Sequence, residues 1–376
     1  MRIVEHYTPD QGITQSILLD WLACRYRAQC ALKDGYEAKA RKTSFRFGSL
    51  FHDTLEDLYG GIRGGRYKRR NIGAVADLLA ARIRAAVAEN LRAAGPGDDR
   101  AEIEDEGPLA EALLGGYLRQ WAADDWAREW VDVEGEFDQT FHPEGPTGPA
   151  YRLRGKRDAV YLQKPRKGAG APGLWLMETK TKSQISEDDL DLALAFDFQS
   201  LFYLLALEEG DPSPAQPIRG CLYNIVRKPS LRPYAVGARR PKAETRAEFL
   251  DRTATDIREK PDHYFKRFEI VFPQKVRDEF RAVLAVQLWD FREWFWGSLP
   301  TYRNPTACIT RYRCEFLGHC ASGGFAGYAR TREFFTELAK SAIPVTPLQR
   351  GESHARTPNH PAPRAGASPA RRAAVR

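Results

Sequence analysis

The segment that constrains the fold most is LWLMETKTKS, residues 174–183, in which four apolar residues lead directly into charged ones. Successive side chains of a strand point to opposite faces of a sheet, so an apolar run at both parities is typical of a central strand covered on both faces. Glu178 and Lys180 then share one face. A buried ion costs several kcal/mol unless a partner compensates it, and a divalent cation is such a partner. The segment therefore predicts a layered α/β fold with a charged cleft at one end of its central strand.

The patterns on either side of this segment give an order of elements. Alternating or continuous apolar residues predict four further strands, at residues 131–141, 151–162, 218–228 and 266–273. Helical spacing predicts four helices, at residues 14–33, 44–61, 188–209 and 274–297, and a helical insertion over about 62–130. Thr14 or Ser16 is expected to cap the first helix and Ser44 the second, which Gly60 and Gly61 would close. This order favours a mixed α/β core that begins with a meander.

The positive charge of the chain is concentrated near its C-terminal end. The formal net charge is +7, and residues 341–376 hold six arginines against one glutamate, which gives +5 of that total. The charge of about +2 on the rest of the chain is weak evidence for a DNA-binding face on the folded part. We expect one domain at residues 1–342, with a cysteine-bearing segment at 300–325, followed by a disordered basic tail at 343–376. Neither a long apolar run nor a signal-peptide pattern is found, so a cytoplasmic protein is expected.

Two carboxylates on neighbouring predicted strands are the strongest candidates for a metal site. Asp158 follows a glycine-containing turn in RGKRDAVYL, and Glu178 lies on the next strand. Carboxylate oxygens converging with Lys180 can bind a hard cation and position a water molecule beside it. Taken singly, Asp158 fits a turn residue at a strand end, and Glu178 with Lys180 fits a surface ion pair.

Two predicted helices carry further candidates. His52 follows Gly48 by one helical turn, so the glycine can permit close backbone approach on the face from which the imidazole projects. Gln199 and Tyr203 are likewise one turn apart on the helix after the central strand. Each pair alone fits an ordinary helix face, and only their joint order with the carboxylates favours an active site.

The succession G-x-x-x-H, G-x-x-D, E-x-K and Q-x-x-x-Y, from Gly48 to Tyr203, resembles the RecB-type branch of the PD-(D/E)XK nuclease superfamily. The resemblance implies a restriction-endonuclease-like core, a mixed central sheet flanked by helices. By the same resemblance Mg²⁺ or Mn²⁺ is held by His52, Asp158, Glu178 and the backbone carbonyl of Thr179. Lys180 would then orient and polarise the attacking water, while Gln199 and Tyr203 would contact the DNA backbone or brace the site. Asp158 follows Arg157 here, where the superfamily pattern has proline.

The resemblance further implies a metal-dependent DNA nuclease, foremost an exonuclease that prefers single-stranded ends. Such enzymes act in DNA recombination and repair, or in phage or CRISPR-type DNA processing, and the partner could be a helicase or recombination protein. Two alternatives stay open: a non-catalytic DNA-end-binding or scaffolding subunit of a helicase–nuclease complex, and an endonuclease. Intact carboxylates and an intact lysine argue against the non-catalytic alternative.

Six cysteines occur in the chain, and a reducing cytosol argues against disulfides among them, which leaves metal or cluster ligation. Cys308, Cys314 and Cys320 are spaced by six residues each. With Cys24 they resemble the cysteines of iron–sulfur members of this branch, including CRISPR-associated RecB-like exonucleases and AddB-type subunits. That resemblance implies a [4Fe-4S] cluster, although the family more often shows a tighter C-x2-C within the late trio.

Other assignments of the cysteine region stay open. Cys30 is the reserve for Cys24 as fourth ligand, and Zn²⁺ is the alternative occupant, with His319 as a possible ligand. Free or buried thiols are the remaining alternative. Cys221, inside the apolar run CLYNIV, is most simply a core residue.

Two segments carry weaker signals of nucleic-acid contact. The basic segment 227–242 offers Arg227, Lys228 and Arg232 for phosphate contacts, and a solvated surface loop fits it equally well. A second segment offers aromatic side chains that can stack on unpaired bases, although packing against the core is favoured: Trp289, Trp294, Phe295 and Trp296.

Overall fold

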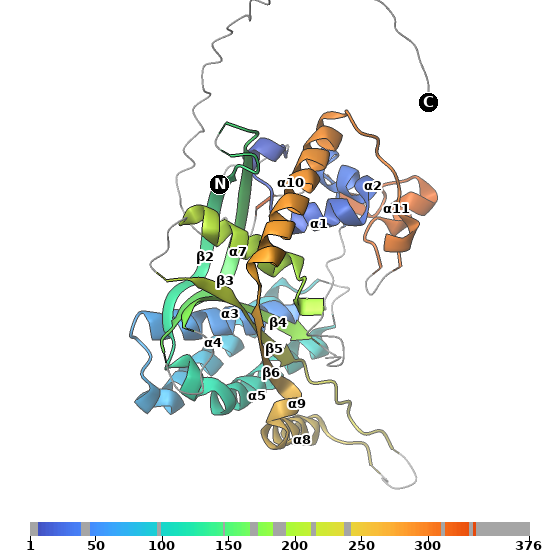
Figure 1. The fold of residues 1–376 in the computed structure, drawn as a ribbon. Helices are drawn as coiled ribbons and strands as arrows, with labels where there is room; N and C mark the ends of the chain where they lie inside the picture. Colours follow the sequence, from blue (N-terminus) through green and yellow to red (C-terminus); the bar gives the residue numbers. More distant parts are fainter. Residues whose placement is uncertain are drawn as a thin grey trace, which may run out of the picture. The chain divides into compact units, whose positions relative to one another are not determined.

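A five-stranded mixed sheet forms the centre of the computed structural model (Figure 1), with strand order β2-β3-β4-β5-β6. The strands are β2 (Glu129–Phe141), β3 (Tyr151–Gln163), β4 (Gly173–Lys182), β5 (Ile218–Arg227) and β6 (Phe265–Val271). Neighbours are antiparallel except β4 and β5, which run parallel. The structure describes residues 7–38, 46–95, 99–145, 147–165, 172–182, 193–211, 216–236, 242–309, 313–330 and 334–335. The mixed α/β core and the strands predicted from the sequence are confirmed.

Strand β4 is covered by helices on both faces, as its apolar run predicts. Trp175 and Met177 pack in one core cluster with α3 (Arg46–Arg63), α4 (Ile72–Ala93) and α5 (Arg100–Asp125). Leu176 packs on the opposite face with α1 (Gln15–Ala23), α7 (Phe198–Gly210) and α10 (Gln274–Trp296). The side chains of Trp175, Leu176 and Met177 are at most 1% exposed, so β4 can carry polar side chains only near its end.

The first predicted helix is interrupted, which corrects the expectation of one helix over residues 14–33. Thr14 caps α1 by accepting a hydrogen bond from the backbone N–H of Ile17, as predicted. The backbone then becomes extended at Cys24 (φ −162°, ψ 114°) before α2 (Arg25–Ala28) and the π-helical turn η2 (Gln29–Lys33). The apolar spacing is kept across this break, so spacing alone does not reveal it.

Helix α3 continues to Arg63, so the prediction that Gly60 and Gly61 close it is wrong. Gly61 lies inside the helix, and glycine is required at this position because the ring of Tyr67 occupies the space that a Cβ would take. Ser44, the predicted cap of α3, lies outside the described residues.

Helix α7 begins at Phe198, where the Asp197 side chain accepts a hydrogen bond from the backbone N–H of Ser200. The expected start near residue 188 lies outside the described residues. In the predicted helical insertion, α4 and α5 are helices as expected, and both contribute to the core on one face of the sheet.

The N-terminal helices pack against residues from much later in the chain. The Trp21 ring lies 5.6 Å from that of Phe291 and 6.3 Å from that of Trp294 (centroid distances). Strand β1 (Glu37–Ala38) pairs with β7 (Tyr328–Ala329) in a second, two-stranded sheet. All of these residues belong to one compact unit, Met1–Lys340, so residues early and late in the chain share one core.

The described residues also form three further α-helices, α8 (Arg246–Glu259), α9 (Pro261–Tyr264) and α11 (Leu317–Ser322), and three short 3-10 helices, η1 (Pro9–Gln11), η4 (Arg69–Asn71) and η5 (Pro305–Ala307). Helices of the described residues are all too short or too polar to cross a bilayer. The predicted tail at 343–376 lies outside the described residues.

Candidate active site

Asp158 and Glu178 lie where β3 and β4 stop pairing. The last paired residues are Ala159 and Met177, and the two carboxylates are the next residues on their strands. Asp158 is two residues from Val160 on β3, and Glu178 is two residues from Leu176 on β4, so each carboxylate shares a face with its neighbour. The side chains of Val160 and Leu176 belong to the core cluster that includes α7. The two carboxylates therefore lie on the same face of the sheet, as the sequence predicts.

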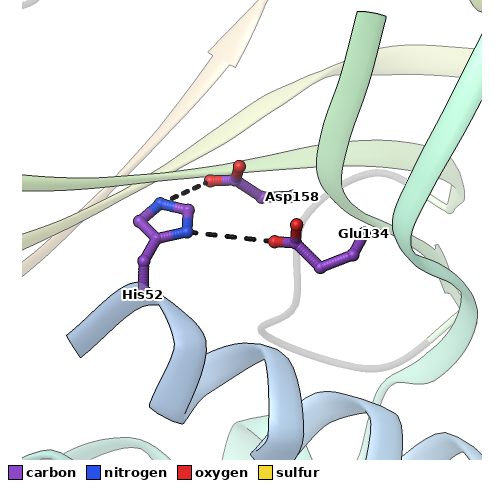
Figure 2. Close-up of side chains that lie close together, drawn as sticks. All are labelled: His52, Glu134 and Asp158. Carbon is purple, nitrogen blue, oxygen red and sulfur yellow. Dashed lines mark ion pairs between the residues drawn. The ribbon is translucent and has the colours of Figure 1, made fainter. Parts of the chain in front are cut away.

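The side chain of His52 projects from α3 toward Asp158 (Figure 2). Its Nε2 lies 3.1 Å from Asp158 Oδ2 and 3.1 Å from the carbonyl oxygen of Thr179. The backbone N–H of Thr179 donates to Asp158 Oδ2 at 2.7 Å. Gly48, one turn earlier on α3, permits this approach, because a Cβ there would lie 2.8 Å from Thr181 Oγ1. Burial lowers the pKa of His52, but the Asp158 carboxylate outweighs burial and raises it to about 10.

Glu134 on β2 is a third potential ligand that was not predicted from the sequence. Its Oε1 lies 3.9 Å from His52 Nδ1, and it forms an ion pair with Lys156. One ligand atom each from His52, Glu134 and Asp158 lie within 4.8 Å of one another. Burial raises the pKa of Glu134, and the Lys156 ammonium opposes that rise. This group has the composition of a site for a hard divalent cation.

A strand irregularity brings Glu134 to this face. The register of β2 on β3 shifts between Trp130 and Asp132, and Glu134 itself has a positive φ of 53°. A shift of one residue moves all later side chains to the other face of a sheet. Glu134 therefore lies opposite Asp158, on the face that simple alternation from the buried Trp130 would not assign to it.

Glu178 is buried, with 1% of its surface exposed, and only one of its oxygens is satisfied. Oε1 accepts hydrogen bonds from Lys180 Nζ at 2.5 Å and from Gln199 Nε2 at 2.8 Å. Oε2 is buried and has no hydrogen-bond partner within the described part of the chain. Burial and the nearby Asp158 raise the pKa of Glu178 to about 7, although Lys180 opposes the rise. An orphaned carboxylate oxygen beside a second carboxylate fits a metal ion as its missing partner.

Gln199 and Tyr203 approach the site from α7. Gln199 Oε1 accepts from Lys180 Nζ at 2.7 Å, so this amide holds both the lysine and Glu178. Burial lowers the pKa of Lys180, but the Glu178 carboxylate outweighs it and leaves that pKa raised. Tyr203 lines a cavity of about 310 Å³ together with Asp158 and Lys156. Gln199 thus braces the charged pair, and Tyr203 forms part of the adjacent wall.

A second, smaller cavity is lined by four cysteines, whose positions in the sequence are far from those of the carboxylates. Cys24, Cys308, Cys314 and Cys320 surround about 90 Å³, together with Arg27 and Arg303. The backbone N–H of Asn304 points to Cys24 Sγ at 3.4 Å. Burial raises the pKa of the Cys314 and Cys320 thiols, whereas Arg27 and Arg303 respectively oppose that rise. These four residues are the ones that the sequence singled out as cluster ligands.

The remaining cysteines and His319 lie elsewhere. Cys30 and Cys221 are at most 1% exposed and belong to the main core cluster. Both ring nitrogens of His319 already have partners, the Tyr26 hydroxyl at 3.0 Å and the Gly324 carbonyl at 3.3 Å. His319 is therefore not placed as a zinc ligand, and Cys221 is a core residue as predicted.

The sulfur atoms of the described cysteines can be compared with the geometry of a single zinc site. Zn–S bonds of about 2.3 Å in a tetrahedron hold the sulfurs about 3.8 Å apart. No three of the cysteines, all of which lie in described segments, have sulfurs within 4.8 Å of one another. The described thiols are therefore not gathered as closely as the ligands of a single zinc ion would be.

The predicted nucleic-acid contacts lie partly at the same edge of the sheet. Arg227 ends β5 beside Lys182 of β4, and the Lys228 ammonium lies 4.8 Å from the Phe47 ring centroid. The Arg232 carbonyl accepts a hydrogen bond from Arg252. Residues 237–241 of this basic segment are not among the described ones.

The aromatic residues of α10 divide into two groups. Trp294 is fully buried and Phe295 packs partly against the core, as favoured. Trp289 and Trp296 are 52% and 56% exposed, so the expectation of core packing is wrong for these two.

A mixed sheet gathers two carboxylates, a lysine and an imidazole at the end of its central strand, and this set of residues could hold a metal ion. The family model of the PD-(D/E)XK nuclease superfamily matches residues 13–321, well over half of the chain. The chain belongs to the PD-(D/E)XK nuclease superfamily. The search of curated proteins found no match.

Proposed function

We propose that this chain is a Mg²⁺- or Mn²⁺-dependent deoxyribonuclease of the RecB-like branch. The observation that carries the proposal is the buried Oε2 of Glu178, which has no hydrogen-bond partner in the described residues and lies on the same face as Asp158. His52, Asp158, Glu178 and the Thr179 carbonyl are the proposed metal ligands, and Glu134 is a further oxygen donor at this site. Membership of a nuclease superfamily supplies the substrate class, a nucleic acid.

The protein groups would divide the work of phosphodiester hydrolysis. A bound divalent cation supplies Lewis acidity and a water molecule of lowered pKa. Lys180, held by Gln199 at 2.7 Å, stabilises negative charge that develops on the phosphate. Glu178 must lose its proton and His52 must be neutral before either can act as a ligand, so both groups exchange protons with the solvent on loading.

Within this proposal the activity is exonucleolytic and prefers single-stranded ends. The resemblance to the RecB-like branch supports this preference, and the described cavity beside Asp158, about 310 Å³ in volume, is where the end of a strand would enter. A helicase or recombination protein that unwinds DNA is the kind of partner that would supply such ends. The endonuclease and the non-catalytic end-binding subunit are the competing functions.

Degradation of end-labelled linear DNA with Mn²⁺ tests the proposal, with a covalently closed circle of the same sequence alongside. The wild type should shorten the linear strand and leave the circle intact, and Lys180→Ala should lose roughly 100-fold or more of the rate. Lys164→Ala is the matched control, because Lys164 follows β3 at the opposite end of the sheet. A cut circle would indicate an endonuclease. Full activity of Lys180→Ala, or no cleavage by the wild type with either metal, would refute the catalytic assignment.

We further propose that Cys24, Cys308, Cys314 and Cys320 hold a [4Fe-4S] cluster. The cavity that these four thiols line and the spacing of their sulfurs support this over zinc. All six cysteines are unpaired thiols, which agrees with the reducing conditions of a cytoplasmic protein. Anaerobically purified wild type and Cys30→Ser should both show iron and a broad visible absorption band, whereas Cys24→Ser should lose them. Zinc without iron, or retention of iron by Cys24→Ser, would contradict the assignment.

A further inference from the structure

A buried polar network lies behind the metal site, on the opposite face of the sheet. Its centre is Asn224 of β5, which is fully buried. Asn224 Nδ2 lies 2.9 Å from the Tyr117 hydroxyl, 3.2 Å from Thr179 Oγ1 and 3.4 Å from the Tyr59 hydroxyl. Buried polar groups of this kind cost free energy unless they are hydrogen-bonded, and here α3, α5, β4 and β6 supply the partners of Asn224.

Arg267 of β6 fixes which way the Asn224 amide faces. The Arg267 Nε donates to Asn224 Oδ1 at 3.2 Å, and a guanidinium group offers donors only. The amide oxygen must therefore face Arg267, which leaves Nδ2 directed at Thr179. Arg267 is itself held by Asp125 at 2.7 Å, and Asp125 also pairs with Arg128 at 3.0 Å. The orientation of Asn224 is thus set by a buried ion pair.

Thr179 connects this network to the proposed ligands. Its side chain points away from Glu178 and Lys180 and accepts from Asn224. Its backbone N–H donates to Asp158 Oδ2 at 2.7 Å, and its carbonyl oxygen lies 3.1 Å from His52 Nε2. Any rotation of the Thr179 backbone would move the carbonyl oxygen, the bound Asp158 and the flanking Glu178 together.

We propose that Asn224 is a positioning residue of the metal site, which acts through Thr179 and contacts neither metal nor substrate. The inference rests on the proposed metal site. Asn224 also helps to position α3, the helix that carries His52. Its amide nitrogen contacts the hydroxyl of Tyr59, which lies two helical turns after His52, as well as that of Tyr117. Loss of such supporting hydrogen bonds at metal sites commonly weakens metal affinity about 10-fold to 100-fold.

Thr179→Val tests the link, because it removes the hydroxyl that Asn224 holds and leaves Asn224 its contacts with Tyr117 and Arg267. Thr253→Val is the matched control, since Thr253 is also fully buried but bonds the Phe249 carbonyl on α8. Mn²⁺ binding is measured without DNA, by electron paramagnetic resonance titration, and thermal unfolding is measured with a chelator present.

The expected result is about 10-fold or greater loss of Mn²⁺ affinity in Thr179→Val, wild-type affinity in Thr253→Val, and similar melting temperatures for the two variants. Wild-type affinity in Thr179→Val would overturn the inference while the metal site stands. An equal loss of affinity in Thr253→Val would also overturn it, because the effect would then be general destabilisation. A wild type that binds no Mn²⁺ would overturn the proposed site itself, and with it the inference.

Discussion

Replacing Glu178 by glutamine is predicted to stabilise the metal-free protein, and the gain should grow with pH. Burial raises the pKa of Glu178 from 4.5 to about 7. The folded state therefore keeps its proton at pH values where the unfolded state has released it, and stability falls as pH rises from about 4.5 to 7. At roughly 1.4 kcal/mol per pK unit, the cost of ionising Glu178 reaches about 3 kcal/mol by pH 8. Glutamine does not ionise and escapes this cost.

Urea unfolding of both proteins, followed by tryptophan fluorescence in the presence of a chelator, measures the effect. The free energy of unfolding of Glu178→Gln minus that of the wild type should increase by about 3 kcal/mol between pH 4.5 and pH 8. Titrating groups far from Glu178 act equally in both proteins and cancel in this difference. In the wild type the Glu178 carboxylate keeps the pKa of Lys180 raised against burial, so the charge of Lys180 is constant there over this range.

A saturating concentration of Mg²⁺ at pH 8 should reverse the order of the two proteins. Metal at about 1,000 times its dissociation constant adds about 4.1 kcal/mol to the wild type, which exceeds the cost of about 3 kcal/mol for ionising Glu178, and the variant, with one ligand carboxylate neutralised, should gain much less. A difference between the proteins that stays constant with pH, or that shrinks as pH rises, would refute the claim that Glu178 is held at a desolvated position.

Two further predictions concern protons and packing. Metal binding should release about two protons at pH 6, from His52 and Glu178, and about one at pH 8.5, where only His52 remains protonated. Calorimetry of metal binding in buffers of different ionisation enthalpy measures the number of protons released. A number that does not vary with pH would contradict the prediction. Within α5, Gly116→Ala should lower the free energy of unfolding by about 1–3 kcal/mol, because its Cβ would lie 2.8 Å from the Phe265 ring. The adjacent Gly115→Ala, whose Cβ meets only the flexible end of Arg119, should be neutral or stabilising by up to about 1 kcal/mol, and equal melting temperatures for the two variants would disprove the packing argument.

The sequence predicted the part of the site that depends on strand parity and helical spacing. Glu178 and Lys180 share a face because they are two residues apart on a regular strand, and Asp158 joins them through regular pairing of β3 with β4. His52 and Gln199 follow from one-turn spacing on helices that are themselves regular. The family resemblance supplied the roles, and the structure brings the groups together.

Residues placed by irregular backbone were not predictable in the same way. Simple alternation would place Glu134 on the same face as the buried Trp130, and only the register shift after Trp130 brings it to the face of Asp158. Cys24 lies in an apolar helical pattern, although its backbone is extended. Asn224 did leave a signal, an amide inside the apolar run CLYNIV, which indicates a buried polar group that requires partners.

The packing of Trp21 against Phe291 and Trp294 has a consequence for how the protein is made. A ribosome adding about 5–20 residues per second needs roughly a quarter of a minute to a minute to travel from one tryptophan to the other. During that interval Trp21 lacks both of these ring partners, since neither has yet been translated. The nascent chain is therefore expected to depend on chaperone binding near its first helix, and variants that weaken α10 should be lost first to aggregation during synthesis.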